Sequence, residues 1–214
     1  MQNQGFIIAR EGFRWIGIGF FLTLLLIILK ATWAAIFLGI LTLFIVSFFR
    51  NPKRSIPAQQ GLIVSPADGT ICLITDAHEK KFLKEQRRRV SIFMSPLNCH
   101  INRAPISAKV LDTYYHPGKF HIASVDKASD LNEQHALLLE DDQKNKFVVV
   151  QIAGWLCRRI VNYTKAGHTL TRGERFGLIQ FGSRVDIYLP PHASLQVQVG
   201  QSVRAGETVI GILK

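Results

Sequence analysis

Cysteine is scarce in this chain, and its pattern argues against two common uses. The 214 residues include three cysteines, Cys72, Cys99 and Cys157. They lie far apart, without the short spacing of zinc ligands, and their odd number does not suit a disulfide framework. The sequence therefore predicts reduced thiols in a cytosolic domain and no metal site.

Acidic residues are also few. The chain has 15 Asp and Glu against 26 Lys and Arg, a net charge of +11. Such a balance favours an anionic partner, either nucleic acid or an anionic membrane surface. The sequence contains no nucleic-acid recognition motif, and its apolar runs favour the membrane. Outside residues 1–54 there are still 20 basic and 14 acidic residues, so we expect a basic domain that prefers anionic lipid headgroups.

Charge is missing from two long runs near the N-terminus, residues 15–29 and 33–49, which only Lys30-Ala31-Thr32 separates. A single helix over both runs would be about 52 Å long, against a hydrocarbon core of about 30 Å. We therefore expect two short helices in a hairpin. Each run is shorter than a standard span, so a spanning hairpin and a re-entrant hairpin both stay open.

Basic residues flank this hairpin on its outer ends. They are Arg10 and Arg14 before it and Arg50, Lys53 and Arg54 after it. The positive-inside rule then places both ends in the cytoplasm. We expect residues 1–54 to form a hairpin in the inner membrane and residues 55–214 to form a domain on the cytoplasmic face. A cleaved signal peptide is disfavoured, because a second apolar run directly follows the first.

A repeat in the last third of the chain predicts the fold class. Five residues recur 33 positions later: Gly167, Leu170, Gly173, Phe176 and Ile179 stand opposite Gly200, Val203, Gly206, Val209 and Ile212. The second copy resembles the half-motif of biotinyl and lipoyl domains. That resemblance implies a mainly β domain, a biotinyl/lipoyl-like β-sandwich or barrel-sandwich hybrid. A carrier role is not expected, because no lysine occupies the usual Met-Lys position at a hairpin tip.

The segment Phe181-Gly182-Ser183-Arg184-Val185-Asp186 reads as a turn that enters a strand. Gly182 has no side chain, so its carbonyl can be approached closely. The Ser183 hydroxyl can add to that carbonyl if a base takes its proton and hydrogen-bond donors hold the oxyanion. A Gly-Ser pair alone is weak support, since most such pairs are ordinary turns.

The longer segment resembles the processing site of phosphatidylserine decarboxylases of the short prokaryotic type, whose motif reads Phe-Gly-Ser-Arg-Val-Asp. The resemblance runs from about residue 50 to the C-terminus. It implies self-cleavage into a beta chain, 1–182, and an alpha chain, 183–214, which stay together as a heterodimer or a higher oligomer. It also implies that Ser183 becomes a covalent pyruvoyl group, which forms a Schiff base with the substrate amine. The implied reaction turns phosphatidylserine into phosphatidylethanolamine and carbon dioxide, with no metal.

The segment Met94-Ser95-Pro96-Leu97-Asn98-Cys99-His100 matches a second element of that family, in which the histidine does acid/base work during decarboxylation. The long type of the family has another histidine three residues further on, as the base for self-cleavage. This chain has Arg103 there, which stays protonated and cannot be that base. The candidates are His100, His116, His121 and His135, with His100 ranked first. Arg103 instead suits a carboxylate or phosphate of the substrate.

Three further positions are candidates. Asp68, in Ser65-Pro66-Ala67-Asp68-Gly69, is either a structural turn residue or, by the resemblance, the group that holds or polarises the processing base. Arg158 and Arg159 are possible phosphate contacts. Two other functions stay open. One is a membrane-anchored adaptor with a lipoyl-like domain and no catalysis; the other is a decarboxylase of another serine-headed lipid, such as archaetidylserine.

Overall fold

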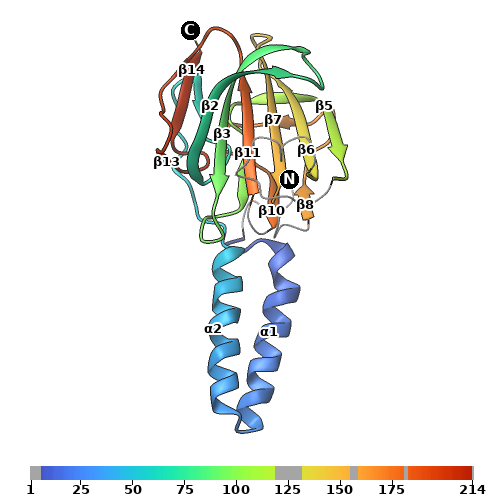
Figure 1. The fold of residues 1–214 in the computed structure, drawn as a ribbon, viewed down its shortest axis with the longest axis vertical. Coiled ribbons are helices and arrows are strands. Elements are labelled where there is room, and N and C mark those ends of the chain that lie inside the picture. Colours follow the sequence, from blue (N-terminus) through green and yellow to red (C-terminus); the bar gives the residue numbers. More distant parts are fainter. Residues whose placement is uncertain (1–5, 119–131, 155–158, 181–182, 214) are drawn as a thin grey trace. The chain divides into compact units, whose positions relative to one another are not determined.

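A computed structural model describes residues 6–118, 132–154, 159–180 and 183–213. The chain divides into two compact units, Met1–Lys53 and Arg54–Lys214. The first holds both helices and the second is mainly β (Figure 1). The predicted fold class is confirmed: a β-rich domain with a curled eight-stranded sheet, preceded by a pair of helices.

The helices α1 (Arg10–Ile28) and α2 (Thr32–Phe48) form the predicted hairpin. They approach closely at Gly19, where an added Cβ would lie 2.5 Å from Thr42 Oγ1. At the open end of the hairpin, Asn51 Nδ2 donates to the carbonyl of Phe6 at 2.6 Å and links the two ends. Among the described residues, α1 alone is long and apolar enough to cross a membrane, while α2 is a shorter apolar helix. The first unit is therefore compatible with membrane association.

In the described part of the second unit there are one large sheet and two small ones, and each neighbouring pair of strands is antiparallel. The large sheet runs in the order β13 (Ser202–Val203), β2 (Gly69–Glu79), β3 (Glu85–Met94), β11 (Ser183–Leu189), β7 (Lys146–Ala153), β6 (Gln134–Glu140), β5 (Ala108–His116) and β9 (Thr169–Leu170). One small sheet is β1 (Leu62–Val64), β14 (Val209–Leu213) and β12 (Ala193–Leu195). The other is β4 (Ile101–Arg103), β10 (Arg175–Gln180) and β8 (Arg159–Asn162).

The core lies on the inner face of the large sheet. Side chains alternate along β11, so Val185, Ile187 and Leu189 point into the main hydrophobic cluster. The outer face is covered in part by the turn between β2 and β3, where Phe82 and Leu83 pack on a second apolar cluster. Ser183 has the same parity as Val185 and therefore belongs to the inner face.

The strands fall into two corresponding halves. The registers of β2 with β3 and of β5 with β6 shift at equivalent places, between Ile71 and Leu73 and between Val110 and Asp112. Reciprocal hydrogen bonds, both 2.9 Å long, join the halves: Val64 N to the Pro105 carbonyl, and Arg103 N to the Pro66 carbonyl. Thus β1, β2, β3, β11, β12, β13 and β14 correspond to β4, β5, β6, β7, β8, β9 and β10.

The 33-residue spacing predicted from the sequence holds in the turns but is wrong in the strands that follow. Gly173 and Gly206 have φ angles of 80° and 79° and are true equivalents. In the first copy Gly177 pairs with Asn102, and in the second copy Gly211 pairs with Ile63. A 33-residue spacing would instead make Ile210 the equivalent of Gly177. One extra residue after Glu207 causes this offset, so Phe176 corresponds to Ile210 rather than to Val209.

Candidate active site

Ser183 is the first residue of β11, in the middle of the large sheet between β3 and β7 (Figure 1). Its register partners are Met94 and Ala153, and its side chain is fully buried. The hydroxyl donates to the thioether sulfur of Met94 at 3.4 Å. Sulfur is a weak acceptor, so this bond orients the hydroxyl but contributes little to stability. Gly182 lies outside the described residues.

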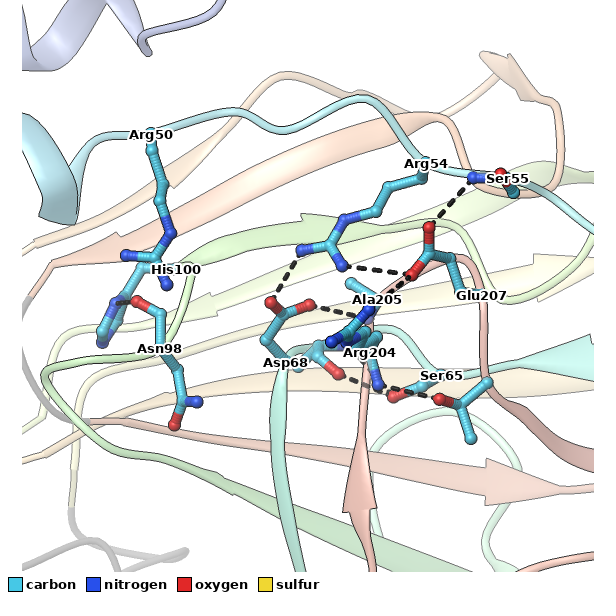
Figure 2. A network of polar contacts seen from close by, with 12 residues as sticks. Arg50, Arg54, Ser55, Ser65, Asp68, Asn98, His100, Arg204, Ala205 and Glu207 are labelled. Carbon is cyan, nitrogen blue, oxygen red and sulfur yellow. Dashed lines mark hydrogen bonds and ion pairs between the residues drawn. The ribbon is translucent and has the colours of Figure 1, made fainter.

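His100 is fully buried just before β4. Its Nδ1 lies 3.0 Å from the carbonyl oxygen of Asn98 (Figure 2). A carbonyl can only accept, so Nδ1 carries a proton and Nε2 is the basic nitrogen of the neutral ring. The His100 carbonyl also accepts from Ile179 N at 3.2 Å, which ties this residue to β10, the strand that leads toward Ser183.

Asp68 makes two strong contacts (Figure 2). Its Oδ2 lies 2.7 Å from Arg54 Nη2, and its Oδ1 accepts from Ala205 N at 2.7 Å. In the other half, Ser107 is the equivalent residue, and its Oγ accepts from Arg172 N at 3.0 Å. The duplicated bond shows that this position anchors a turn. The predicted role of Asp68 toward a processing base stays a prediction.

The three predicted arginines are placed differently. Arg103 is half-buried and donates to the carbonyl of Gly173 at 2.9 Å. Burial, and then the nearby positive charge of Arg54, lower its pKa. Arg159 opens β8 and is exposed opposite Gln180, and Arg158 lies outside the described residues. The bond from Arg103 to Gly173 joins the end of β4 to a turn of the fold, and the predicted role of Arg103 in binding substrate stays a prediction.

Of the other candidate bases, His135 lies on the inner face of β6. Asn162 Nδ2 approaches its Nδ1 at 2.7 Å, and an amide nitrogen can only donate, so the ring nitrogen accepts. Burial, and then Lys81, lower the pKa of His135 to about 4. His135 is therefore neutral at working pH. His116 stacks on Tyr114, with ring centroids 6.5 Å apart, and His121 lies outside the described residues.

Sequence reasoning missed an ion pair between two residues of the motif that contains Ser183. Arg184 and Asp186 are each 1% exposed. They make two contacts, from Arg184 Nε to Oδ1 at 2.9 Å and from Nη2 to Oδ2 at 3.0 Å. Arg89 Nη1 lies 3.9 Å from the same carboxylate. The sequence contained the signal for this pair, because Arg184 and Asp186 are two residues apart on a predicted strand and such residues share a face.

Sequence reasoning also missed two buried amides beside Ser183. Asn102 and Gln151 are fully buried, and Gln151 Nε2 donates to Asn102 Oδ1 at 2.7 Å. Asn102 Nδ2 lies 3.7 Å from Met94 Sδ, the same sulfur that the Ser183 hydroxyl contacts. These residues come from β4 and β7, far apart in the sequence, so no local pattern could have joined them.

Among the residues that the structure describes, no group of three or more His, Cys, Asp or Glu side chains could hold a metal ion.

Comparison with known proteins decides the family. A family model described as phosphatidylserine decarboxylase matches residues 41–211. The chain belongs to the phosphatidylserine decarboxylase family. Relatives named phosphatidylserine decarboxylase proenzyme are 46% identical in Geotalea uraniireducens and 47% identical in Syntrophotalea carbinolica, each over 100% of both chains. The relative of that name in Ruegeria pomeroyi is 45% identical over 95% of this chain and 94% of its own.

Membership makes this chain one of a family of carboxy-lyases. The resemblance inferred from the segments around Ser183 and His100 is confirmed at the level of the family. An adaptor without catalysis therefore has no support from these relatives.

Proposed function

We propose that this chain decarboxylates phosphatidylserine to phosphatidylethanolamine, after cutting itself between Gly182 and Ser183 to make a pyruvoyl group. The observation that carries the proposal is the position of Ser183. In a chain of this family, it is a fully buried serine on the inner face of the central strand of the sheet. The relatives' name, proenzyme, supports a precursor that requires processing.

The first step is a balanced rearrangement. The Ser183 oxygen bonds to the Gly182 carbonyl carbon, the Gly182–Ser183 amide bond breaks, and a base passes the hydroxyl proton to the new amine. Elimination then releases the Gly182 carboxylate, and water replaces the nitrogen, which leaves as ammonia. Residue 183 is then a ketone at the new N-terminus.

The surroundings of Ser183 fit such a group. Strand β11 pairs with β3 over seven residues and with β7 over six, so a chain that begins at residue 183 is held on both sides. The hydroxyl contacts a thioether, a weak acceptor, and little is lost when it is consumed. The pyruvoyl group would supply an electrophilic ketone that bonds the substrate amine and takes up the electrons left by carbon dioxide.

His100 is the group we assign to proton transfer. Its Nδ1 is fixed by the Asn98 carbonyl, which leaves Nε2 as the nitrogen that gains and loses a proton. Its burial keeps that proton away from bulk water. The same imidazole suits protonation of the substrate carbon after carbon dioxide leaves.

The apolar hairpin supports a lipid substrate. A diacyl lipid presents its headgroup only at the bilayer surface, and a tethered domain meets it without extracting it, at a high effective concentration. The chain's charge of +11 favours an anionic lipid. We place the hairpin in the inner membrane and the β domain on its cytoplasmic face, as the flanking basic residues indicate.

Replacing the nucleophile tests the proposal. On a denaturing gel, the wild-type chain should give two fragments, and the smaller should carry a carbonyl that hydrazine traps. Ser183→Ala should give one unbroken chain of 24.1 kDa that releases no carbon dioxide from phosphatidylserine vesicles. Ser91→Ala is the matched control, because Ser91 is also fully buried in the sheet, and it should be cleaved normally.

An unbroken wild-type chain, or carbon dioxide release by Ser183→Ala, would contradict the proposal. Archaetidylserine vesicles, assayed in parallel, separate the two serine-headed lipids.

A further inference from the structure

The buried amides beside Ser183 form part of a polar layer between two sheets. Asn102 pairs with Gly177 on one side of β10, and Asn162 pairs with Gly177 on the other. Gln151, from the large sheet, lies over Gly177, where an added Cβ would be 2.7 Å from its Nε2. Thus three residues with amide side chains, from three different strands, adjoin one glycine inside the domain.

The other half of the fold has an apolar layer at the same place. The registers make Ile63 the equivalent of Asn102, Leu195 the equivalent of Asn162 and Leu189 the equivalent of Gln151. All three belong to the main hydrophobic cluster or pack against it. Gly211 takes the place of Gly177. The architecture is therefore satisfied by apolar residues at these positions.

The polar layer contributes less to folding stability than apolar residues at the same positions would. Among the described residues, Gln151 Oε1 has no hydrogen-bond partner although it is buried, and an unsatisfied buried polar atom opposes folding. Amides at positions where the fold accepts isoleucine and leucine require a reason other than stability. Such locally unfavourable residues are expected at functional sites.

Contacts connect the layer to the cleavage site through one atom. Gln151 donates to Asn102, Asn102 donates to Met94 Sδ, and the Ser183 hydroxyl donates to the same sulfur. Met94 is a flexible side chain with a long, unbranched reach. A second donor on its sulfur restricts where that sulfur can lie, and the sulfur in turn directs the hydroxyl.

We propose that Asn102, held by Gln151, is a positioning residue for self-cleavage. The pair fixes the Met94 thioether, and the thioether fixes the direction of the Ser183 hydroxyl before it attacks. The inference rests on the proposed self-cleavage but concerns a separate property, the rate at which the precursor is cut. Attack on a carbonyl depends steeply on orientation, so loss of this alignment slows cleavage while the nucleophile remains.

The experiment exchanges the amides for the residues of the other half. The variant Asn102→Ile with Gln151→Leu, the variant Met94→Leu and the combination of all three changes are made by cell-free synthesis of the full chain. Fragment formation is followed over time on denaturing gels, and thermal unfolding is measured on each product. Val149→Ala is the control for lost packing, because Val149 is buried on the same strand and face as Gln151.

We expect the double variant Asn102→Ile with Gln151→Leu to fold and to unfold at no lower temperature than the wild type. It should form fragments more slowly, on the order of tenfold or more. Met94→Leu should be slowed similarly. The combined variant should be no slower than the slower of its parents, because both act through one sulfur atom. Val149→Ala should be cut at the wild-type rate despite a lower unfolding temperature.

A wild-type cleavage rate in the double variant would overturn the role of Asn102. So would a combined variant in which the rate reductions of its two parents multiply. Should the exchange fail to fold, Met94→Leu carries the test alone, since this swap nearly conserves volume; a wild-type rate there also overturns the inference. An unbroken wild-type chain would instead contradict the proposed self-cleavage itself. That outcome is measured on the wild type, whereas the role of Asn102 is measured on the variants.

Discussion

At the scale of single residues, a buried ion pair holds the strand that begins at Ser183. Arg184 and Asp186 follow Ser183 directly, yet they point to the opposite face of β11. Their ion pair is almost fully buried, and removing one partner of such a pair leaves an uncompensated charge in the interior. The arginine and aspartate of the motif thus secure the strand that begins at Ser183.

Asp186→Asn should lower the free energy of unfolding by about 3–5 kcal/mol, because the charges of Arg184 and Arg89 lose their buried counterion. Chemical denaturation in the uncleaved Ser183→Ala background measures this without interference from processing. Asp76→Asn is the control. Its pair with Arg88 is at 2.6 Å but exposed, so the change should cost at most about 1 kcal/mol. Equal effects of the two changes would contradict the argument.

The stability of the fold should depend on the protonation of His135. Its pKa in the folded chain is about 4, below the ordinary value of 6.5, so the unfolded chain binds the proton more readily. The stability that this histidine contributes is present above pH 6.5 and declines as the pH falls toward 4. Denaturant unfolding at pH 7, 6, 5 and 4 should show a smaller decline for His135→Gln than for the wild type. Parallel curves for the two proteins would argue against this assignment.

At the scale of elements, glycine decides how the two helices meet. A Cβ on Gly19 would lie 2.5 Å from Thr42 Oγ1, whereas a Cβ on Gly17 would meet nothing within 4 Å. Both glycines lie on α1, and only one faces α2. The hairpin is therefore specified by one small residue as well as by its apolar composition.

Gly19→Ala should destabilise the hairpin by about 1–3 kcal/mol, because Thr42 must move to admit the new methyl group. Gly17→Ala should be neutral or stabilising by up to about 1 kcal/mol, because alanine is the better helix former and has room. Thermal unfolding of the full chain in detergent, followed by its helical circular dichroism, distinguishes them. A gain in stability for both changes would show that the close contact is unimportant.

At the scale of the whole molecule, the twofold repeat would keep a chain assembled after the proposed cut before Ser183. Strand β11 has partners on both edges, and β14 is the central strand of a separate small sheet between β1 and β12. The proposed cleavage before Ser183 would leave all these pairings intact. The strands after Ser183 are interleaved with the rest of the domain through two sheets.

We expect the cleaved protein to elute from gel filtration as one species in native buffer. The fragments 1–182 and 183–214 should separate only after denaturant is added, because their strands share one core. Uncleaved Ser183→Ala is the size reference and should elute at the same volume. Separation of the fragments in native buffer would contradict this account.

The sequence by itself determined the helix pair, the β-rich class, the turns of the repeat and the family, because apolar runs, glycine turns and a contiguous motif around Ser183 are local signals. Only the tertiary structure decided that Asp68 anchors a turn, that Asn102 and Gln151 meet, and that the layer around Gly177 contains amides where the layer around Gly211 is apolar. Those facts depend on strand register and on contacts between distant segments. A one-residue offset such as the one after Glu207 changes which side chains meet, and no local pattern encodes it.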